Sequence, residues 1–330
     1  MKIIVTGNAG FIGSHLVDTL IKKGHIVYGI DDLSGGFKRN INPKCNFIKL
    51  DISSPKTYSI VKAIKADILC HLAADATEGR SQFTPISSIR SNFLGYMNVL
   101  AGTIAGGVKK VILTSSMSVY GAQKPPFTED MLRKPEDIYA VNKVAMERVT
   151  EILSQVHGFI YTIIRPHNVF GERQNIRDPY RNVIGIWMNR IMNKKAPIIY
   201  GDGKQIRSFS YIDNCIPPLI RVIEGNFHQE IINIGPEETI TLLKLANVVL
   251  KAMKCPRKPL FYPDRPLEVK KAFCSSKKAK RLLGYKTTIT LQEGIERMAL
   301  WAKELGPQPF QYLDELELPN VPLVWKKKIL

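Results

Sequence analysis

The chain has 330 residues, of which 45% are hydrophobic, and it carries a formal net charge of +18 at pH 7, which is enough for one large domain or two modest ones. It has no apolar run of about 18 residues and no secretory leader at its N-terminus, so we expect neither a membrane span nor export. Its five cysteines are widely spaced, without a C-x-x-C pair, which indicates reduced thiols in a cytoplasmic setting and argues against a zinc site.

The first half of the chain alternates short apolar runs with amphipathic stretches of helical period. The predicted strands are residues 2–6, 25–30, 46–50, 67–73, 109–116 and 159–165, and the predicted helices are residues 11–24, 58–65, 86–105 and 138–157. This alternation predicts the α/β class, with a Rossmann-type doubly wound parallel sheet. The nearly continuous apolar character of the strands fits a sheet that is buried on both faces.

The pattern loosens in the second half, where prolines and glycines multiply. Two further helices are predicted there, over residues 241–254 and 291–305. We therefore predict a dinucleotide-binding core over residues 1–166 and a smaller substrate lobe, interleaved with it, over residues 167–305. The proline-rich residues 306–330 predict a loosely packed extension.

Three glycines, Gly7, Gly10 and Gly13, follow the first predicted strand and open the first predicted helix. They allow a tight turn and a close approach of the backbone to a pyrophosphate, and the helix N-terminus offers free N–H groups to the anion. Phe11 and Ile12 lie in the same turn and are expected to contact the cofactor. The G-x-x-G-x-x-G spacing is weak alone, but its place between strand and helix predicts a dinucleotide site.

The second predicted strand leads into Asp31 and Asp32. An acidic residue at this position bonds the hydroxyls of the adenosine ribose. Because a carboxylate repels a 2′-phosphate, NAD is favoured over NADP, although Lys38 and Arg39 follow closely and weaken that preference. The alternative is an aspartate that only caps a turn.

With these features the chain resembles the extended short-chain dehydrogenase/reductase superfamily, in particular its nucleotide-sugar epimerases and dehydratases. The closest resemblance is to UDP-glucose 4-epimerase-like proteins, and it covers roughly residues 1–305. The motifs that carry it are GNAGFIGSH (7–15), Asp51-Ile52, HLAA (71–74), Ser115-Ser116 with VYG (119–121), YAVNK (139–143) and RPHNVFG (165–171).

The resemblance implies that Tyr139 is the catalytic acid/base, with Lys143 as its partner. Four residues apart on a helix, the two side chains share one face. A tyrosine with its usual pKa of about 10 is a poor base, but a nearby ammonium or a positive nicotinamide ring favours the phenolate. Lys143 would also hold the nicotinamide ribose, and Ser116 would orient the reacting oxygen. The alternative is a half-buried aromatic ring beside a solvated amine.

Further contacts are implied by the resemblance alone. Those to the cofactor are Asp51, Ile52, Leu72, Ala73, Ala74, Asn92 and Ser115. Those to the substrate are Asn168 at the sugar nucleotide, Arg207 at the diphosphate, Arg265 with Glu268 at the diphosphate and uridine ribose, and Ala272 beside the C2 group of the sugar. The small Ala272 leads us to expect that N-acetylated UDP-hexoses are accepted. For the arginines, the alternative is a surface ion pair.

We therefore expect an NAD-dependent nucleotide-sugar 4-epimerase that acts on UDP-hexoses through a transient 4-keto sugar. The alternatives on the same scaffold are a reductase, a uronate epimerase and a dehydratase. Met117 and Ser118 stand where resembling dehydratases carry an Asp-Glu pair, which argues against dehydration. A homodimer is expected through the helices at residues 86–105 and 138–157. The side chains expected at its seam are Leu94, Met97, Val144 and Met146.

The large positive charge raises another hypothesis, a non-enzymatic NAD-binding or nucleic-acid-associated protein. The basic residues occur mostly as scattered doublets, and no zinc finger, RNA-binding aromatic signature or basic helix is visible. A positive field would equally attract an anionic substrate. Because the set of Tyr139, Lys143 and Ser116 is complete, we favour the enzyme and expect no nucleic acid, no membrane and no metal.

Overall fold

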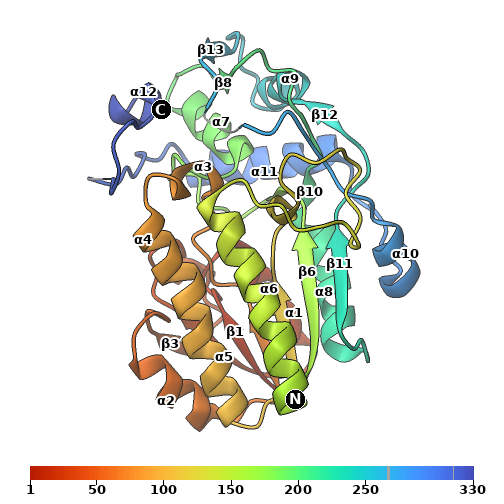
Figure 1. The fold of residues 1–330 in the computed structure, drawn as a ribbon. Coiled ribbons are helices and arrows are strands. Elements are labelled where there is room, and N and C mark those ends of the chain that lie inside the picture. Colours follow the sequence, from red (N-terminus) through yellow and green to blue (C-terminus); the bar gives the residue numbers. More distant parts are fainter. Residues whose placement is uncertain (266–267, 315) are drawn as a thin grey trace.

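A seven-stranded parallel sheet forms the centre of the computed structural model, which describes residues 1–265, 268–314 and 316–330 (Figure 1). Its strand order is β11-β6-β5-β4-β1-β2-β3. The strands are β1 (Lys2–Thr6), β2 (Ile26–Asp31), β3 (Asn46–Lys49), β4 (Ile68–His71), β5 (Lys110–Thr114), β6 (Ile160–Pro166) and β11 (Glu230–Ile234). The predicted fold class is therefore confirmed.

Helices cover both faces of this sheet (Figure 1). They are α1 (Phe11–Lys22) and α8 (Ile212–Glu224) on one face, and α2 (Lys56–Ile64), α5 (Gly95–Ala105) and α6 (Ile138–His157) on the other. Side chains alternate between the two layers as expected for a strand. Ile3 and Val5 pack on the side of α1 and α8, whereas Ile4 packs with Leu100 and Met146 on the other.

The helix predicted over residues 86–105 is divided. It consists of α4 (Pro85–Ser88), a π-helical stretch η2 (Ile89–Leu94) and α5. Within the wider π turn, Asn92 is fully buried, and its Nδ2 donates to the Ser88 carbonyl oxygen at 2.9 Å. The helix predicted over residues 138–157 is confirmed as α6, which begins after Asp137, whose side chain accepts from the Ala140 N–H at 2.8 Å.

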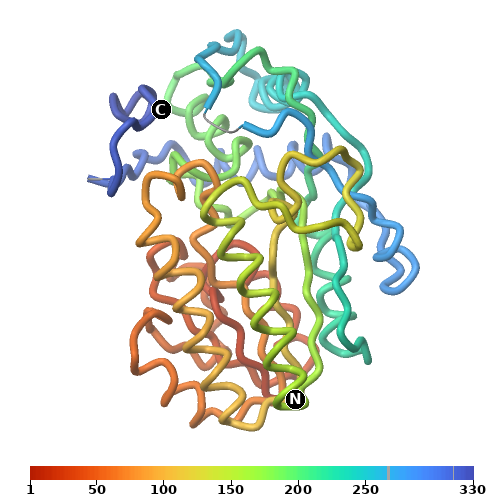
Figure 2. Tube along the Cα trace, in the orientation of Figure 1, coloured from red at the N-terminus to blue at the C-terminus, as the bar shows by residue number. Residues whose placement is uncertain are grey.

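The second half of the chain builds a lobe over the carboxyl edge of the sheet (Figures 1 and 2). Its larger helices are α7 (Val183–Met192), α9 (Leu242–Ala252) and α11 (Leu291–Leu305). Its short strands form three small sheets: β12 (Ile240–Thr241), β9 (Ile206–Arg207) and β14 (Lys271–Ala272); β13 (Leu260–Tyr262) and β8 (Ile198–Tyr200); β10 (Ser210–Tyr211) and β7 (Val169–Phe170). The remaining short helices are η1 (Lys38–Asn40), α3 (Glu78–Ser81), η3 (Met117–Tyr120), α10 (Lys277–Leu283) and α12 (Leu323–Lys326).

The segment beyond Leu305, which was expected to be a loosely packed extension, is anchored on the lobe at its end. Val324, Trp325 and Leu330 are buried in a cluster that also contains Phe83 and Tyr180. The prolines of this segment suggested loose packing, but the segment also carries enough aromatic and aliphatic side chains to pack against the lobe. Figure 2 shows it, in blue, beside the orange segment that contains α3 and α4. In the described part of the chain, no helix is both long and apolar enough to cross a bilayer.

Candidate active site

A cavity of about 750 Å³ opens at the carboxyl edge of the central sheet, beneath the second lobe. Such an edge is where doubly wound folds place their ligands. All the predicted site residues except Asn92 line this cavity. On the cofactor side these are Gly7, Gly10, Phe11, Ile12, Gly13, Asp31, Asp32, Asp51, Ile52, Leu72, Ala73, Ala74 and Ser115. The others are Ser116, Tyr139, Lys143, Asn168, Arg207, Arg265, Glu268 and Ala272.

The glycine turn between β1 and α1 leaves space that any side chain would fill. Gly7 has φ of +72°, and a Cβ there would lie 2.8 Å from the Ala73 nitrogen. A Cβ on Gly13 would overlap the Gly7 carbonyl oxygen. Gly10, the N-cap of α1, brings no side chain to cover the first turn. Free N–H groups on an open helix end suit a pyrophosphate, so the chain fits a dinucleotide here.

Asp31 sits at the end of β2, with both carboxylate oxygens toward backbone donors. Oδ2 accepts from the Ala9 N–H at 3.0 Å, and Oδ1 accepts from the Leu33 N–H at 2.8 Å. Burial raises the pKa of Asp31, while these N–H groups oppose the rise. Lys38 and Arg39, which weakened the preference for NAD, are not among the described residues that line the cavity.

Asn92 lies behind the cavity wall. Its Oδ1 accepts from the Asp75 N–H at 3.0 Å, and its Nδ2 donates to the Ser88 carbonyl oxygen. These bonds fix the segment that follows β4, so in this structure Asn92 holds a cavity-lining loop in place.

Tyr139 and Lys143 lie on one face of α6, and both are buried. The Lys143 Nζ is 5.6 Å from the centroid of the Tyr139 ring and donates to the Thr114 carbonyl oxygen at 2.8 Å. Ser116 follows β5, and its Oγ accepts from the Ser118 N–H at 3.1 Å. Two elements that are far apart in sequence thus bring the three predicted catalytic side chains together.

The pKa of Tyr139 is not lowered in the protein alone, although the nearby Lys143 ammonium was expected to favour the phenolate. Burial and the charge of Glu78 raise the pKa of Tyr139, although a hydrogen bond from Ser116 opposes the rise. Burial lowers the pKa of Lys143 to about 8, against the favourable charge of Glu147. In the protein alone, Tyr139 is therefore a neutral phenol near neutral pH, and Lys143 by itself does not make it a base.

A buried ionic network supports the strand end beneath these residues. Ser115 Oγ donates to Glu147 Oε1 at 2.6 Å, and the same carboxylate pairs with Arg165 at 2.6 Å. Arg133 also reaches Glu147 at 2.6 Å. The Ser115 hydroxyl is thus committed to Glu147, so what Ser115 offers the cavity is mainly its backbone.

The substrate half of the cavity is dominated by paired charges. Glu268 accepts from Arg207 at 3.0 Å through one oxygen and from Arg265 at 2.7 Å through the other. Both guanidinium groups are thereby held at one wall, with donors left for an oxyanion. Asn168 donates to the Ser208 carbonyl oxygen at 2.8 Å, and Ala272 pairs with Arg207 between β14 and β9.

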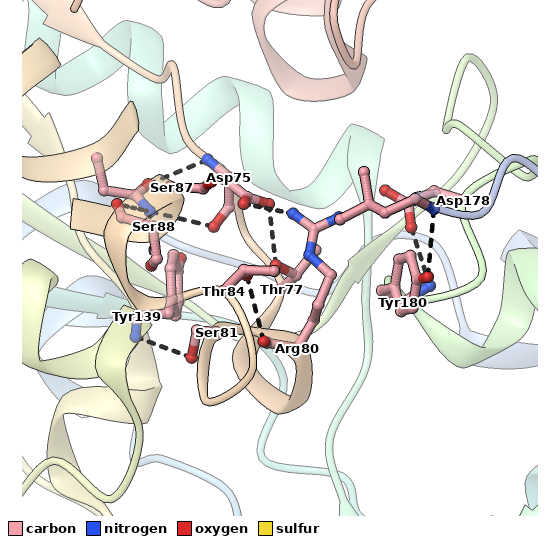
Figure 3. A network of polar contacts seen from close by, with 12 residues as sticks. Asp75, Thr77, Arg80, Ser81, Thr84, Ser87, Ser88, Tyr139, Asp178 and Tyr180 are labelled. Atoms are coloured by element: carbon pink, nitrogen blue, oxygen red, sulfur yellow. Dashed lines mark hydrogen bonds and ion pairs between the residues drawn. The ribbon is translucent and has the colours of Figure 1, made fainter. Parts of the chain in front are cut away.

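The sequence analysis did not find a polar network after β4, shown in Figure 3. Arg80 forms an ion pair with Asp75, and its guanidinium carbon lies 5.0 Å from the centroid of the Tyr180 ring. Ser81 Oγ accepts from the Tyr139 N–H at 3.1 Å, which joins this segment to the start of α6. The concentration of charged residues in AADATEGRSQF (73–83) was the available signal.

Glu78 was also missed, although it lines the cavity and is accessible from it. Although its side chain is open to the cavity, Glu78 is enclosed by protein around the cavity, and this partial desolvation, together with the charge of Asp137, raises the pKa of Glu78 to about 7, while Arg207 opposes the rise. A carboxyl group that titrates near neutral pH beside the arginines and Tyr139 is a candidate functional group. Within the described residues, no group of three or more His, Cys, Asp or Glu side chains could hold a metal ion.

Comparison with known proteins agrees with this geometry. The chain is 32% identical over 303 residues to a putative UDP-glucose 4-epimerase of Methanocaldococcus jannaschii, covering 91% of this chain and 98% of that protein. Its structure is similar to that of Thermotoga maritima UDP-glucose 4-epimerase with UDP-glucose, with a TM-score of 0.87, 30% identity, and coverage of 92% of this chain and 99% of the other.

A second similar structure is UDP-N-acetylglucosamine 4-epimerase from Methanobrevibacter ruminantium M1 in complex with UDP-N-acetylmuramic acid. Its TM-score is 0.84 at 29% identity, with coverage of 91% of this chain and 97% of the other. The sequence model of the NAD dependent epimerase/dehydratase family matches residues 3–235. The chain therefore belongs to the NAD dependent epimerase/dehydratase family.

Proposed function

We propose that this protein is an NAD-dependent nucleotide-sugar 4-epimerase that interconverts UDP-hexoses through a transient 4-keto sugar. The observation that carries the proposal is one continuous cavity. It joins the glycine turn, the group of Tyr139, Lys143 and Ser116, and the arginines held by Glu268. The two similar structures named above, of a UDP-glucose 4-epimerase and a UDP-N-acetylglucosamine 4-epimerase, support this choice of reaction.

The cofactor would be held by the turn at Gly7–Gly13, by Asp31 at the ribose, and by Lys143. Bound NAD+ supplies a reversible hydride acceptor and a positive charge beside Tyr139. That charge favours the phenolate and so opposes the effect of burial on the pKa of Tyr139. The raised pKa in the protein alone therefore fits a residue that becomes a base only in the loaded site.

In the proposed reaction, Tyr139 accepts the proton of the 4-hydroxyl group as C4 is oxidised, and it returns a proton when C4 is reduced. Ser116 hydrogen-bonds the same oxygen and orients it. Arg207 and Arg265 hold the diphosphate, so the keto sugar can turn over and present its other face while the nucleotide stays bound. The cofactor ends as it began, and no net oxidation occurs.

The main alternatives are a uronate epimerase, a reductase or a dehydratase on the same scaffold. Met117 and Ser118 both line the cavity, and neither can serve as the carboxyl acid or base that elimination of water requires. Accumulation of a 4-keto-6-deoxy sugar would overturn this reading. A reductase would consume reduced cofactor in proportion to product, and an epimerase would not.

The test is to incubate the purified protein and NAD+ separately with UDP-glucose, UDP-galactose and their N-acetyl forms, and to read the products by NMR. A 4-epimerase should bring each pair to the same ratio from either direction, without net reduction of the cofactor. If no pair interconverts, the proposed reaction is wrong.

We also propose a cytoplasmic homodimer. Leu94 and Val141 are 46% and 47% exposed on the neighbouring elements η2 and α6. Met97 on α5 and Val144 on α6 are partly exposed. Met146, however, is fully buried in the core of the monomer, so its assignment to the seam is wrong. Light scattering at micromolar concentration should give the mass of two chains, and a monomer would contradict the proposal.

A further inference from the structure

The segment after α11, residues 306–314 and 316–330, crosses the lobe and is fixed at several points. The Gln308 N–H donates to Asn189 Oδ1 at 2.9 Å, on α7. The Gln311 N–H donates to the Arg177 carbonyl oxygen at 2.8 Å. These bonds hold the beginning of the C-terminal segment to one side of the cavity.

The same segment is then attached to the opposite side of the cavity. Glu317 accepts from the Ile86 N–H at 2.7 Å and from the Ser87 N–H at 2.8 Å, at the start of α4. The Leu318 N–H donates to the Phe83 carbonyl oxygen at 3.1 Å. The C-terminal segment therefore bridges the loop after β4 and the substrate lobe.

The end of the segment is buried and carries an aromatic anchor. Trp325, on α12, is only 4% exposed, and its ring packs edge-on against Tyr180 at 5.1 Å and Phe83 at 6.0 Å between centroids. Arg190 Nη1 donates to the Ile329 carbonyl oxygen at 2.8 Å, and the Leu330 N–H donates to Tyr312 Oη at 2.8 Å. These aromatic contacts and hydrogen bonds hold the C-terminal end in one position on the lobe.

This anchored end also forms part of the cavity. Its lining residues are Leu313, Pro322, Trp325 and Leu330. A Cβ placed on Gly79 would lie 3.4 Å from Trp325 Cη2 and 3.5 Å from Arg265 Nη1, so the indole and the guanidinium flank one glycine. Arg265 in turn lies 5.0 Å from the centroid of the Tyr200 ring. Trp325 thus stands next to the arginines, at the wall that also contains Tyr200.

One polar atom at this wall lacks a partner. Gln205 Oε1 is buried without a hydrogen-bond partner among the described residues, whereas the Trp325 indole N–H faces Tyr200 Oη beside it. Gln205 itself is 1% exposed and lines the cavity. Buried polar groups are normally paired, so the unpaired Gln205 oxygen marks a place where a ligand that carries a donor would complete the hydrogen bond.

We infer that the C-terminal segment is part of the substrate site and that Trp325 forms the wall against which the nucleoside of the sugar nucleotide packs. The inference rests on the proposed function, which places the diphosphate at Arg207 and Arg265 and the sugar at Tyr139. The nucleoside then extends past the arginines, where the Trp325 ring and the unpaired Gln205 oxygen suit a planar heterocycle that carries hydrogen-bond donors.

The test measures binding of UDP by calorimetry to the full-length protein and to Trp325→Ala, at equal NAD content. The variant should bind UDP about tenfold more weakly, because an aromatic contact is lost, and should raise KM for UDP-glucose with little change in kcat. Leu323→Ala is the matched control, since Leu323 lies on the same α12, is 54% exposed and does not line the cavity; it should bind UDP like the unaltered protein.

Trp325→Phe keeps an aromatic ring packed against Phe83 and Tyr180. It provides a second test of the inference if the alanine variant fails to fold. It should bind UDP with weaker affinity than the unaltered protein. Unchanged UDP affinity in the folded Trp325 variants would overturn the inference and leave the proposed function standing. An unaltered protein that binds no UDP would instead overturn the proposed function, and this inference with it.

Discussion

The two halves of the cavity are built in different ways. The cofactor half is made from the ends of consecutive strands. Asp31 is the last residue of β2, and Gly7, Asp51 and Ala73 come just after the ends of β1, β3 and β4. The substrate half combines the loop after β4, the small sheet of β9 and β14, and the C-terminal segment. A parallel sheet brings local motifs together at one edge by its own geometry, whereas the substrate half depends on long-range packing.

The two halves also differ in chemistry. The glycine turn offers backbone N–H groups and space, so it selects a ligand by close approach. The substrate half holds paired charges, with Arg207 and Arg265 sharing Glu268 and Arg80 pairing with Asp75. Substitutions in the first half should therefore act through shape, and those in the second through charge and size. Tyr139 lies between the two.

Tyr139→Phe should have the largest effect on activity, because Tyr139 lies between the two halves of the cavity and is proposed to transfer the proton in the reaction. Loss of the hydroxyl should lower kcat by about 10²- to 10⁴-fold, the range of general acid–base catalysis. NAD content and thermal stability should remain near those of the unaltered protein, since the change leaves the ring in place. Activity within a few-fold of the unaltered enzyme would show that another group moves the proton.

Gly13→Ala should break the cofactor half selectively. The added Cβ would overlap the Gly7 carbonyl oxygen, so the glycine turn must shift. If that shift costs about 1–3 kcal/mol, as overpacking typically does, and the cost falls on cofactor binding, NAD affinity should fall roughly 5- to 150-fold. Gly24→Ala is the control, since Gly24 has φ of +83° but no atom within 4 Å of an added Cβ. It should lose some stability and keep NAD. If both variants lose NAD equally, the glycine turn does not have the proposed role in cofactor binding.

The same contrast explains what the sequence could predict. Strands β1 to β6 and helix α6 follow from local periodicity, and so does the glycine turn. Strand β11 (Glu230–Ile234) joins the sheet beside β6 from the second half of the chain, and its five residues are distinguishable only by that long-range pairing. Glu78 and Trp325 acquire their positions from packing between distant segments, which no local pattern encodes. Met146 was misplaced because its helix has apolar residues on more than one face.

Ala272→Tyr tests the role of side-chain size in the substrate half, because it enlarges one side chain of the cavity wall and adds no charge. Ala272 is buried beside Met117 in a small apolar cluster and lines the cavity. A phenol ring there should cut kcat/KM for UDP-GlcNAc roughly tenfold or more relative to UDP-glucose, because a pocket discriminates strongly once a group no longer fits. NAD content should be unchanged. Equal losses for both sugars would remove Ala272 from the discrimination.

Glu78→Gln should have the smallest effect, and it tests charge in the substrate half. With its pKa raised to about 7 by burial, Glu78 is mostly protonated below that pH and ionised above it. The ionised form places a negative charge near Arg207 and Arg265, where the diphosphate is proposed to bind. KM for UDP-glucose should therefore rise about 3- to 10-fold between about pH 6 and pH 8 in the unaltered enzyme.

The glutamine variant is neutral throughout this range, so its KM should stay near the low-pH value of the unaltered enzyme. Asp137, whose pKa burial raises to about 6, remains in both proteins. Because its charge raises the pKa of Glu78, the two carboxyl groups titrate together, and the difference between the two proteins measures the loss of Glu78 with the accompanying change at Asp137. UDP-glucose is preferred to UDP as the probe because the terminal phosphate of UDP itself titrates near pH 6. Glu304→Gln, at an exposed position on α11, should keep the original profile. If Glu78→Gln keeps it as well, the pH dependence arises elsewhere and charge at Glu78 does not govern the substrate half.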